Sequence, residues 1–247
     1  MKLGAKKLAS LCFGTMLAMS SIANAAPISP NFTSFGNLTA LDGSAVDFGG
    51  SGIPTSPAAI TEFTTAGGDT VRLGLIATPR FSSPSPTNDG AGTYTVQPGE
   101  SDPGLSLWNI SVYAESSGDL ADAGIRFYYD LDPTAGNDLS TLGFVDIPDA
   151  ALLIPIGSVA EGSVNMGFGF LRNSMGALTA PTPLPGIFDP FAPGEYSFWL
   201  GAIDANGQPA EYAAINVNVS PIPLPAGLPL LVGAMGGLLW MRKRQRT

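Results

Sequence analysis

Apolar and polar residues alternate along most of the chain, and this alternation predicts β-strands. It is clearest in six segments, at residues 71–75, 108–115, 125–131, 165–170, 195–203 and 210–219. A period of two places successive side chains on opposite faces of a strand, so each segment is expected to bury one face and expose the other. Weaker patterns predict further strands at residues 45–48, 60–64, 92–96 and 142–147.

Turn-forming residues separate these segments. Asn206-Gly207 supplies the positive φ angles that a tight or bulged hairpin needs between the strands predicted at 195–203 and 210–219. Prolines predict loops at residues 78–92 and 180–193, because proline cannot donate a hydrogen bond within a central strand. Residues 27–44 are expected to form a loose leader or an edge segment.

These patterns predict an all-β fold. Roughly eight to ten short strands, joined by Gly, Pro, Ser and Asp turns, favour a single antiparallel β-sandwich over residues 26–221. Its topology is expected to be immunoglobulin-like or jelly-roll. A single-stack β-helix is less favoured, because the sequence contains no fixed repeat.

Residues 1–25 have the three parts of a secretory signal peptide. Residues 8–19 are mostly apolar, and Ala23-Asn24-Ala25 is a small-residue cleavage site, so signal peptidase is expected to cut after Ala25 or Ala26. The basic start comprises Lys2, Lys6 and Lys7. A transmembrane helix is the alternative, but the apolar run is short for one. The only cysteine, Cys12, lies in this segment, so the mature protein would contain none.

Residues 222–247 combine a proline motif, an apolar run and a basic end. The motif consists of Ile222, Pro223, Leu224, Pro225 and Ala226. Residues 223–241 are uncharged and approach the length of about 20 residues that spans a bilayer as a helix. The positive-inside rule would keep the basic end in the cytoplasm; it comprises Arg242, Lys243, Arg244 and Arg246. An ordinary single-pass tail anchor is the alternative interpretation.

This three-part tail resembles the PEP-CTERM class of sorting signals in its VPLPA-type variant, with Ile222 in place of the leading valine. The resemblance implies that a membrane-embedded exosortase recognises the proline motif and cleaves near it. The exported part would then be released, or transferred to the envelope or extracellular matrix of a Gram-negative bacterium that makes exopolysaccharide. The protein would cross the inner membrane and be anchored there only transiently. The resemblance concerns processing, not what the body binds.

The body between the two ends is strongly acidic. It carries four arginines and all twenty acidic residues, a formal net charge of −16. Such a surface repels nucleic acid and anionic lipid headgroups, and it favours solubility outside the cell. The chain has no histidine, which excludes Ser-His-Asp and Cys-His catalysis and histidine-ligated metals. The body also lacks lysine, which excludes a Ser-Lys dyad.

The densest cluster of polar residues follows the strand predicted at 125–131. Asp130, Asp132, Asn137 and Asp138 offer the hard oxygen ligands that calcium prefers, although one such loop would bind it weakly, on the order of millimolar. The spacing is not that of an EF-hand. The alternative is a β-turn in which Asp and Asn side chains bond nearby backbone amides. No other cofactor is expected.

Three aromatic residues fall on the strand faces opposite the predicted core: Tyr113, Tyr128 and Trp199. Exposed there, they would form a platform for stacking sugars. The alternative is that loops or a second sheet cover them. A pair of carboxylates could also support glycoside hydrolysis, although no recognisable motif marks such a pair.

Together these features predict an exported, non-enzymatic envelope or matrix protein with a structural or adhesive role linked to exopolysaccharide. A carbohydrate- or calcium-binding module is the first alternative, and a secreted carboxylate-dependent glycoside hydrolase is the second. The expected partners are signal peptidase, exosortase, the membrane before processing, and exopolysaccharide, with no nucleic acid among them.

Overall fold

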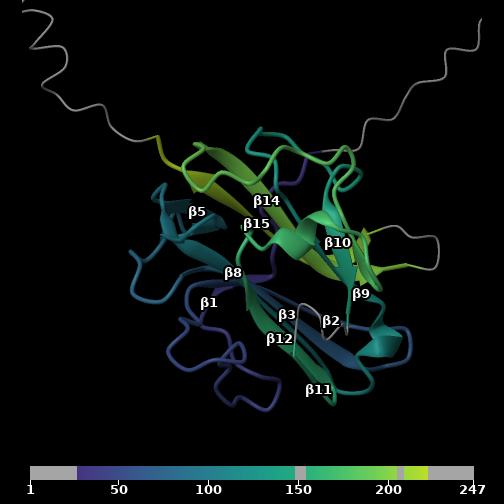
Figure 1. The fold of residues 1–247 in the computed structure, drawn as a ribbon. Coiled ribbons are helices and arrows are strands. Elements are labelled where there is room, and N and C mark those ends of the chain that lie inside the picture. Colours follow the sequence, from purple (N-terminus) through teal and green to yellow (C-terminus); the bar gives the residue numbers. More distant parts are fainter. Residues whose placement is uncertain (1–26, 148–153, 205–208, 222–247) are drawn as a thin grey trace, which may run out of the picture.

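The computed structural model describes residues 27–147, 154–204 and 209–221, which form an all-β body of two main sheets (Figure 1). One sheet has six antiparallel strands in the order β1 (Ser34–Gly36), β2 (Ala58–Thr64), β3 (Thr70–Pro79), β8 (Trp108–Ser116), β12 (Val159–Val164) and β11 (Ile154–Ile156). The other has seven, in the order β13 (Leu178–Thr179), β10 (Gly143–Asp146), β9 (Ile125–Tyr129), β14 (Gly194–Ile203), β15 (Pro209–Val219), β5 (Thr93–Val96) and β4 (Thr87–Asn88). Three small elements complete the described chain: a ribbon of β6 (Glu100–Asp102) and β7 (Leu105–Ser106), and the 3-10 turns η1 (Ala121–Ala123) and η2 (Gly169–Arg172).

The strong period-two segments form the centres of both sheets, as predicted. Strands β3, β8, β9, β14 and β15 cover the segments at 71–75, 108–115, 125–131, 195–203 and 210–219. The weaker predictions at 60–64, 92–96 and 142–147 are also confirmed, as β2, β5 and β10. One pairing differs from an antiparallel fold, because β5 runs parallel to β15.

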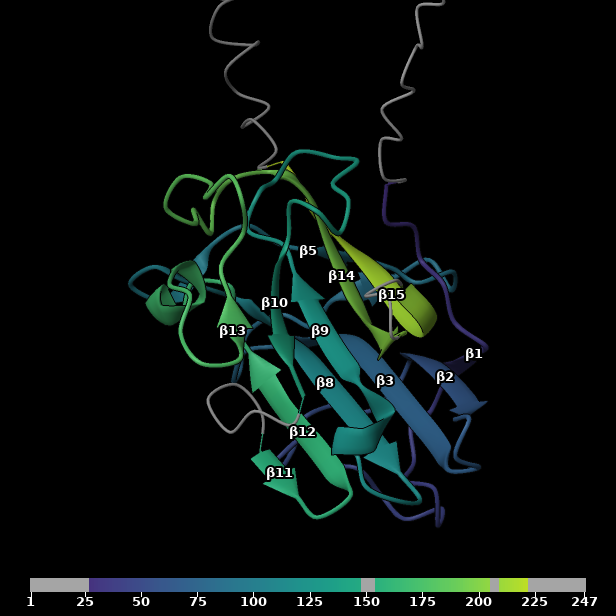
Figure 2. The ribbon, with the colours of Figure 1, turned by 90° about the vertical axis from the view of Figure 1, so that its right-hand side faces the viewer.

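The inner faces of the two sheets share one apolar core. Strand β15 of the seven-stranded sheet lies against β2 and β3 of the other sheet (Figure 2). Trp108 on β8 is 1% exposed and meets Phe198 on β14 at 6.2 Å between ring centroids, edge to face. Phe198 in turn stacks on Phe127 of β9. Aromatic side chains of this size contribute the most apolar area per residue to a core.

The N-terminal segment joins the two sheets along one edge. Asn31 forms a bridge with Ala214 of β15, and the chain then enters β1 at the edge of the six-stranded sheet. The carbonyl of Tyr212 accepts hydrogen bonds from Asn31 Nδ2 at 3.0 Å and from Thr61 Oγ1 at 2.8 Å, which links both sheets at one atom. The edge segment expected within residues 27–44 is therefore present.

Residues 37–56 lie over the outer face of the six-stranded sheet, and side chains of that face hold them there. Arg72 donates to the carbonyl of Thr39 at 3.0 Å. Glu115 accepts from the amide of Leu41 at 2.6 Å, and Glu161 accepts from the amide of Phe48 at 3.1 Å. We call residues 37–56 the cover segment.

The strand predicted at 45–48 is wrong. Asp47 Oδ1 accepts from the amide of Gly49, an Asx turn, and Phe48 has a φ of 54°. A positive φ is incompatible with a strand. Phe48 is 2% exposed, so its apolar character serves the packing of the cover segment instead.

The prediction of a strand at 165–170 is also wrong. Strand β12 ends at Val164, and the next residue, Asn165, turns the chain out of the sheet. Asn165 is fully buried, and its Oδ1 accepts from the amides of Ser106 at 3.1 Å and Gly167 at 3.0 Å. Its Nδ2 donates to the carbonyls of Ser106 at 3.0 Å and Trp108 at 2.9 Å. The chain then turns into η2 and leaves the sheet.

Several expectations lie outside the described residues: the signal peptide at 1–25, the Asn206-Gly207 turn, and the tail at 222–247 with its proline motif, apolar run and basic end. Among the described residues, no helix is long and apolar enough to cross a membrane.

We expect Asn165→Ala to lower the free energy of unfolding by about 2–4 kcal/mol, because it leaves several buried backbone groups of residues 106–108 without a partner. Urea denaturation followed by tryptophan fluorescence measures this. Asn173→Ala is the matched control, since Asn173 is exposed and its amide makes one bond, to the carbonyl of Gly169. Equal losses for the two variants would contradict the role of Asn165.

Candidate functional site

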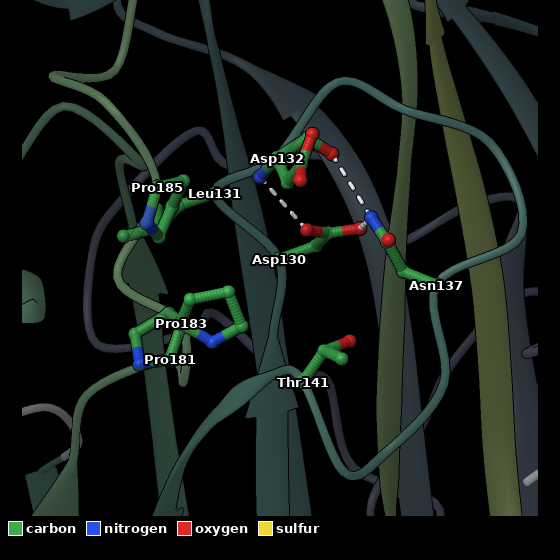
Figure 3. A pocket seen from close by; sticks show the side chains of 8 residues that line it. All are labelled: Asp130, Leu131, Asp132, Asn137, Thr141, Pro181, Pro183 and Pro185. Carbon is green, nitrogen blue, oxygen red and sulfur yellow. Dashed lines mark hydrogen bonds between the residues drawn. The ribbon is translucent and has the colours of Figure 1, made fainter.

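A pocket of about 130 Å³ lies where the chain leaves β9. The loop that follows β9 forms one wall, and the proline loop predicted at 180–193 forms the other (Figure 3). The lining side chains are Asp130, Leu131, Asp132, Asn137, Thr141, Pro181, Pro183 and Pro185. The pocket thus unites the predicted polar cluster with prolines about 50 residues away in the sequence, a pairing that no local pattern indicates.

Asp130 is the buried carboxylate of this pocket. Its side chain continues the outward-facing row of β9, and the residue is only 1% exposed. Its Oδ1 accepts from the amide of Asp132 at 2.9 Å. Its Oδ2 accepts from the amide of Ser197 on β14 and from Asn137 Nδ2, both at 3.0 Å. Three N–H donors therefore occupy both oxygens, as burial of a charged group requires.

Asn137 organises the loop as a hydrogen-bond donor. Besides Asp130, its Nδ2 reaches the carbonyl of Asp132 at 3.1 Å (Figure 3). It also reaches the carbonyl of Thr134 at 3.0 Å. The backbone carbonyl of Asn137 accepts from the amide of Ile28, which fastens the N-terminal segment to the loop. The Asn137 amide nitrogen donates to the Asp130 carboxylate, so fewer lone pairs of that carboxylate remain for a cation.

Asp138 does not line the pocket with the other three predicted ligands. Its Oδ1 accepts from the amide of Ser140 at 2.8 Å and so begins a separate turn. These contacts match the alternative to a calcium site, a turn in which Asp and Asn side chains bond nearby backbone amides. Within residues 27–147, 154–204 and 209–221, no group of three or more His, Cys, Asp or Glu side chains could hold a metal ion.

Burial raises the pKa of the Asp130 carboxyl from 3.8 to about 6. Loss of hydration disfavours the charged form more than the three N–H donors favour it, and the negative charge of Asp132 adds to the rise. The folded protein therefore binds this proton more tightly than the unfolded chain does. The stabilisation is present in full well below pH 3.8 and is lost as the pH rises through about 6.

The predicted aromatic platform is not exposed, which corrects that expectation. Trp199 is 2% exposed, Tyr128 is 7% exposed and Tyr113 is 2% exposed. Tyr128 meets Trp199 edge to face at 5.4 Å, and Tyr212 stacks on the same indole at 5.2 Å. Ile28 and Leu142 belong to the same cluster, so the N-terminal segment and the loop after β9 cover the outer face of the seven-stranded sheet.

Tyr113 is buried for a different reason. It lies under the cover segment, and its hydroxyl donates to Glu115 Oε2 at 2.7 Å. Burial is the main cause of the raised pKa of the Tyr113 hydroxyl, and the hydrogen bond to Glu115 adds to it. None of the three rings is therefore free to stack on a sugar in this structure.

A second hollow, of about 180 Å³, lies beside β1 and was not predicted. Its walls are mostly hydroxyl, amide and charged side chains: Thr33, Ser34, Asn37, Thr39, Glu62 and Arg72, with Ile60. Arg72 Nη2 and Glu62 Oε2 form an ion pair at 2.6 Å across one side. Arg72 is one of only four arginines in the body, and that scarcity is the one signal in the sequence that could have marked it.

Asp130→Asn removes the titration of the buried carboxyl. Relative to this variant, we expect the wild-type free energy of unfolding to fall by about 2 kcal/mol as the pH rises from about 4 to about 6. Urea denaturation at stepped pH values measures the difference. Asp138→Asn, in the same loop, is the control and should keep the wild-type fall. Parallel curves for wild type and Asp130→Asn would overturn the assignment.

Trp199→Ala is expected to lower the free energy of unfolding by about 3–5 kcal/mol, because it opens a cavity among Tyr128, Tyr212 and Ile28. Phe81→Ala is the control, since Phe81 is 79% exposed and its loss should change stability by less than about 0.5 kcal/mol. Thermal unfolding of both variants compares them. A Trp199→Ala variant as stable as the wild type would contradict its buried role.

Comparisons with known proteins identify no relative of the chain. No family model matches the chain, and neither a curated protein nor a solved structure matches it. A functional conclusion therefore has to come from the chemistry of the chain's own residues and from the resemblance of its tail.

Proposed function

We propose that the chain is an exported, non-enzymatic envelope or extracellular-matrix protein that signal peptidase and an exosortase process at its two ends. The observation that carries the proposal is the order of parts in the tail: the proline motif at 222–226, the apolar run, and the basic end at 242–246. The acidic body fits an existence outside the cell, and its role would be structural or adhesive, linked to exopolysaccharide.

The arrangement of the chain ends supports this proposal. The described chain begins and ends at the same end of the body (Figures 1 and 2). A signal peptide and a tail helix inserted in one membrane would therefore hold the body by the same end before processing. Ile28, two or three residues after the proposed cleavage site, is already part of the fold and is 8% exposed.

We further propose that the body is a β-sandwich of immunoglobulin-like or jelly-roll type. Two sheets with one shared core support this, as do the connections from β3 to β5 and from β5 to β8, each of which passes from one sheet to the other. A mature body without cysteine would depend on this core for its stability.

A carbohydrate-binding module is the second candidate. The site that favours it is the hollow beside β1, since the aromatic rings are buried. The Arg72–Glu62 pair and the neighbouring Thr and Asn side chains offer both donors and acceptors, which is what sugar hydroxyls require. Binding of host exopolysaccharide that is lost in Arg72→Ala and retained in Arg126→Ala would support this candidate.

The hydrolase alternative has one feature to rest on. Asp130 and Asp132 line the same pocket, and Asp130 has the raised pKa of a general acid. Against it, N–H donors already engage both oxygens of Asp130. Turnover of a polysaccharide, abolished by Asp130→Asn, would be needed to revive this alternative.

Replacing both Pro223 and Pro225 by alanine should leave the full-length protein in the inner membrane, because the proposed recognition motif is lost. Intact mass of the protein recovered separately from membrane and extracellular fractions of the native host measures this. The wild type should lack about the first 25 residues and the segment after about residue 223. Pro183→Ala and Pro185→Ala together are the control and should be processed as wild type. Normal processing of the motif variant would mean that the tail is a simple anchor.

A further inference from the structure

Three large apolar side chains of the proline loop stand in solvent. Ile187 is 87% exposed, Leu184 is 48% exposed and Phe191 is 46% exposed. Exposed apolar residues that gather on one segment mark a surface that meets another apolar phase, whereas single ones are ordinary.

The structure holds this loop in place. Phe188, between two of the exposed side chains, is 6% exposed and packs on Trp108 and Tyr196 at 6.3 and 5.7 Å between ring centroids. The carbonyl of Pro190 accepts from the amide of Gly99 at 2.9 Å, and the carbonyl of Gly186 accepts from the Arg172 guanidinium. Ile187 and Phe191 are therefore presented outward because Phe188 is anchored inward.

The loop lies beside the point where the chain leaves the body. It runs directly into β14, whose first residue, Gly194, pairs with Val219 at the end of β15. The next residue, Ser220, donates its amide to the carbonyl of Val96, close to the Gly99–Pro190 contact. In both ribbon views the loop lies at the end of the body that carries the two chain ends (Figures 1 and 2).

The loop itself carries less charge than the rest of the body. Between residues 173 and 194 the only charged residue is Asp189, whose Oδ1 accepts from the amide of Phe191. The remaining body carries four arginines and nineteen acidic residues, which anionic headgroups repel. With one acidic residue in 22, this loop meets less of that repulsion near lipid than the rest of the body does.

We propose that Leu184, Ile187 and Phe191 insert into the surface of the lipid bilayer while the tail at 222–247 is anchored in it. This inference rests on the proposed function, because the tail supplies the anchor. The anchored tail starts one residue after Pro221 and so keeps the loop at a high effective concentration near the membrane. Apolar side chains inserted at the interface would then fix the orientation of the body and the position of the proline motif.

Fluorescence of single labels tests this proposal in the full chain. In a Cys12→Ser background, an NBD label is placed at Ile187→Cys, and the protein is reconstituted in phosphatidylcholine vesicles with the body outside. Ala66→Cys is the control, since Ala66 is exposed in the β2–β3 turn. Strand β3 separates it by about 30 Å from the loop's end of the sheet. Leu230→Cys reports insertion of the tail.

A blue shift and loss of dithionite quenching at position 187, with position 66 fully quenched, would support the proposal. Quenching at both positions while position 230 stays protected would overturn the lipid contact and leave the anchored tail intact. Quenching at position 230 would overturn the proposed function, and this inference with it. Protection at 187 that disappears when the protein is diluted in lipid would identify a second copy of the chain instead.

Charge substitution provides a second measurement. With the label at Leu184→Cys, the double variant Ile187→Asp and Phe191→Asp should lose its protection from dithionite, because the two carboxylates would have to enter the interface. Both residues are exposed, so the fold should be kept. Ala66→Asp is the charge-matched control and should leave the protection unchanged. Protection that survives the double variant would contradict insertion through these side chains.

Discussion

The described body contains no cysteine, so the side chains between its two sheets have to hold the sheets together. Trp108 stands at the centre of this contact: it starts β8 in one sheet and meets Tyr196 and Phe198 of β14 in the other. Phe188 packs on the same indole from the proline loop. The packing of the two sheets and the position of the proline loop therefore depend on the same aromatic cluster. Because the cluster is closely packed, displacing one of its rings would expose the neighbouring rings.

Both outer faces of the sheets are covered as well, by chain that is distant in sequence. The cover segment lies over β3, β8 and β12, where Arg72, Glu115 and Glu161 hold its backbone. Burial raises the pKa of Glu161, and the nearby carboxylate of Asp47 raises it further, so part of this attachment is a pair of acids rather than an ion pair. On the other side, Ile28 and the loop after β9 cover Trp199 and Tyr128. Side chains that look available on a strand are thus interior in the folded protein.

The surface that remains has two different regions. Most of it carries the acidic residues, with three of the four arginines in ion pairs to carboxylates: Arg72 with Glu62, Arg80 with Asp102 and Arg126 with Asp146. The proline loop next to the chain exit is nearly uncharged and presents Ile187 and Phe191. The proposed insertion of the loop in a membrane rests on this contrast between an acidic surface and one nearly uncharged loop.

Local patterning determined much of this protein. Alternation with a period of two located β3, β8, β9, β14 and β15, because each of these strands has one face on the core. The prolines at 180–193 predicted a loop there, and the structure contains no strand in that range. The tail motif predicts processing, and that part of the chain lies outside the described residues. The pattern failed at Asn165 and Phe48, where one side chain or one positive φ overrides the alternation. Tertiary structure alone decided the fate of Asp130, Tyr128 and Trp199. A period of two distinguishes the two faces of a strand, but whether the outer face meets water depends on segments tens of residues away, whose paths the strand does not encode.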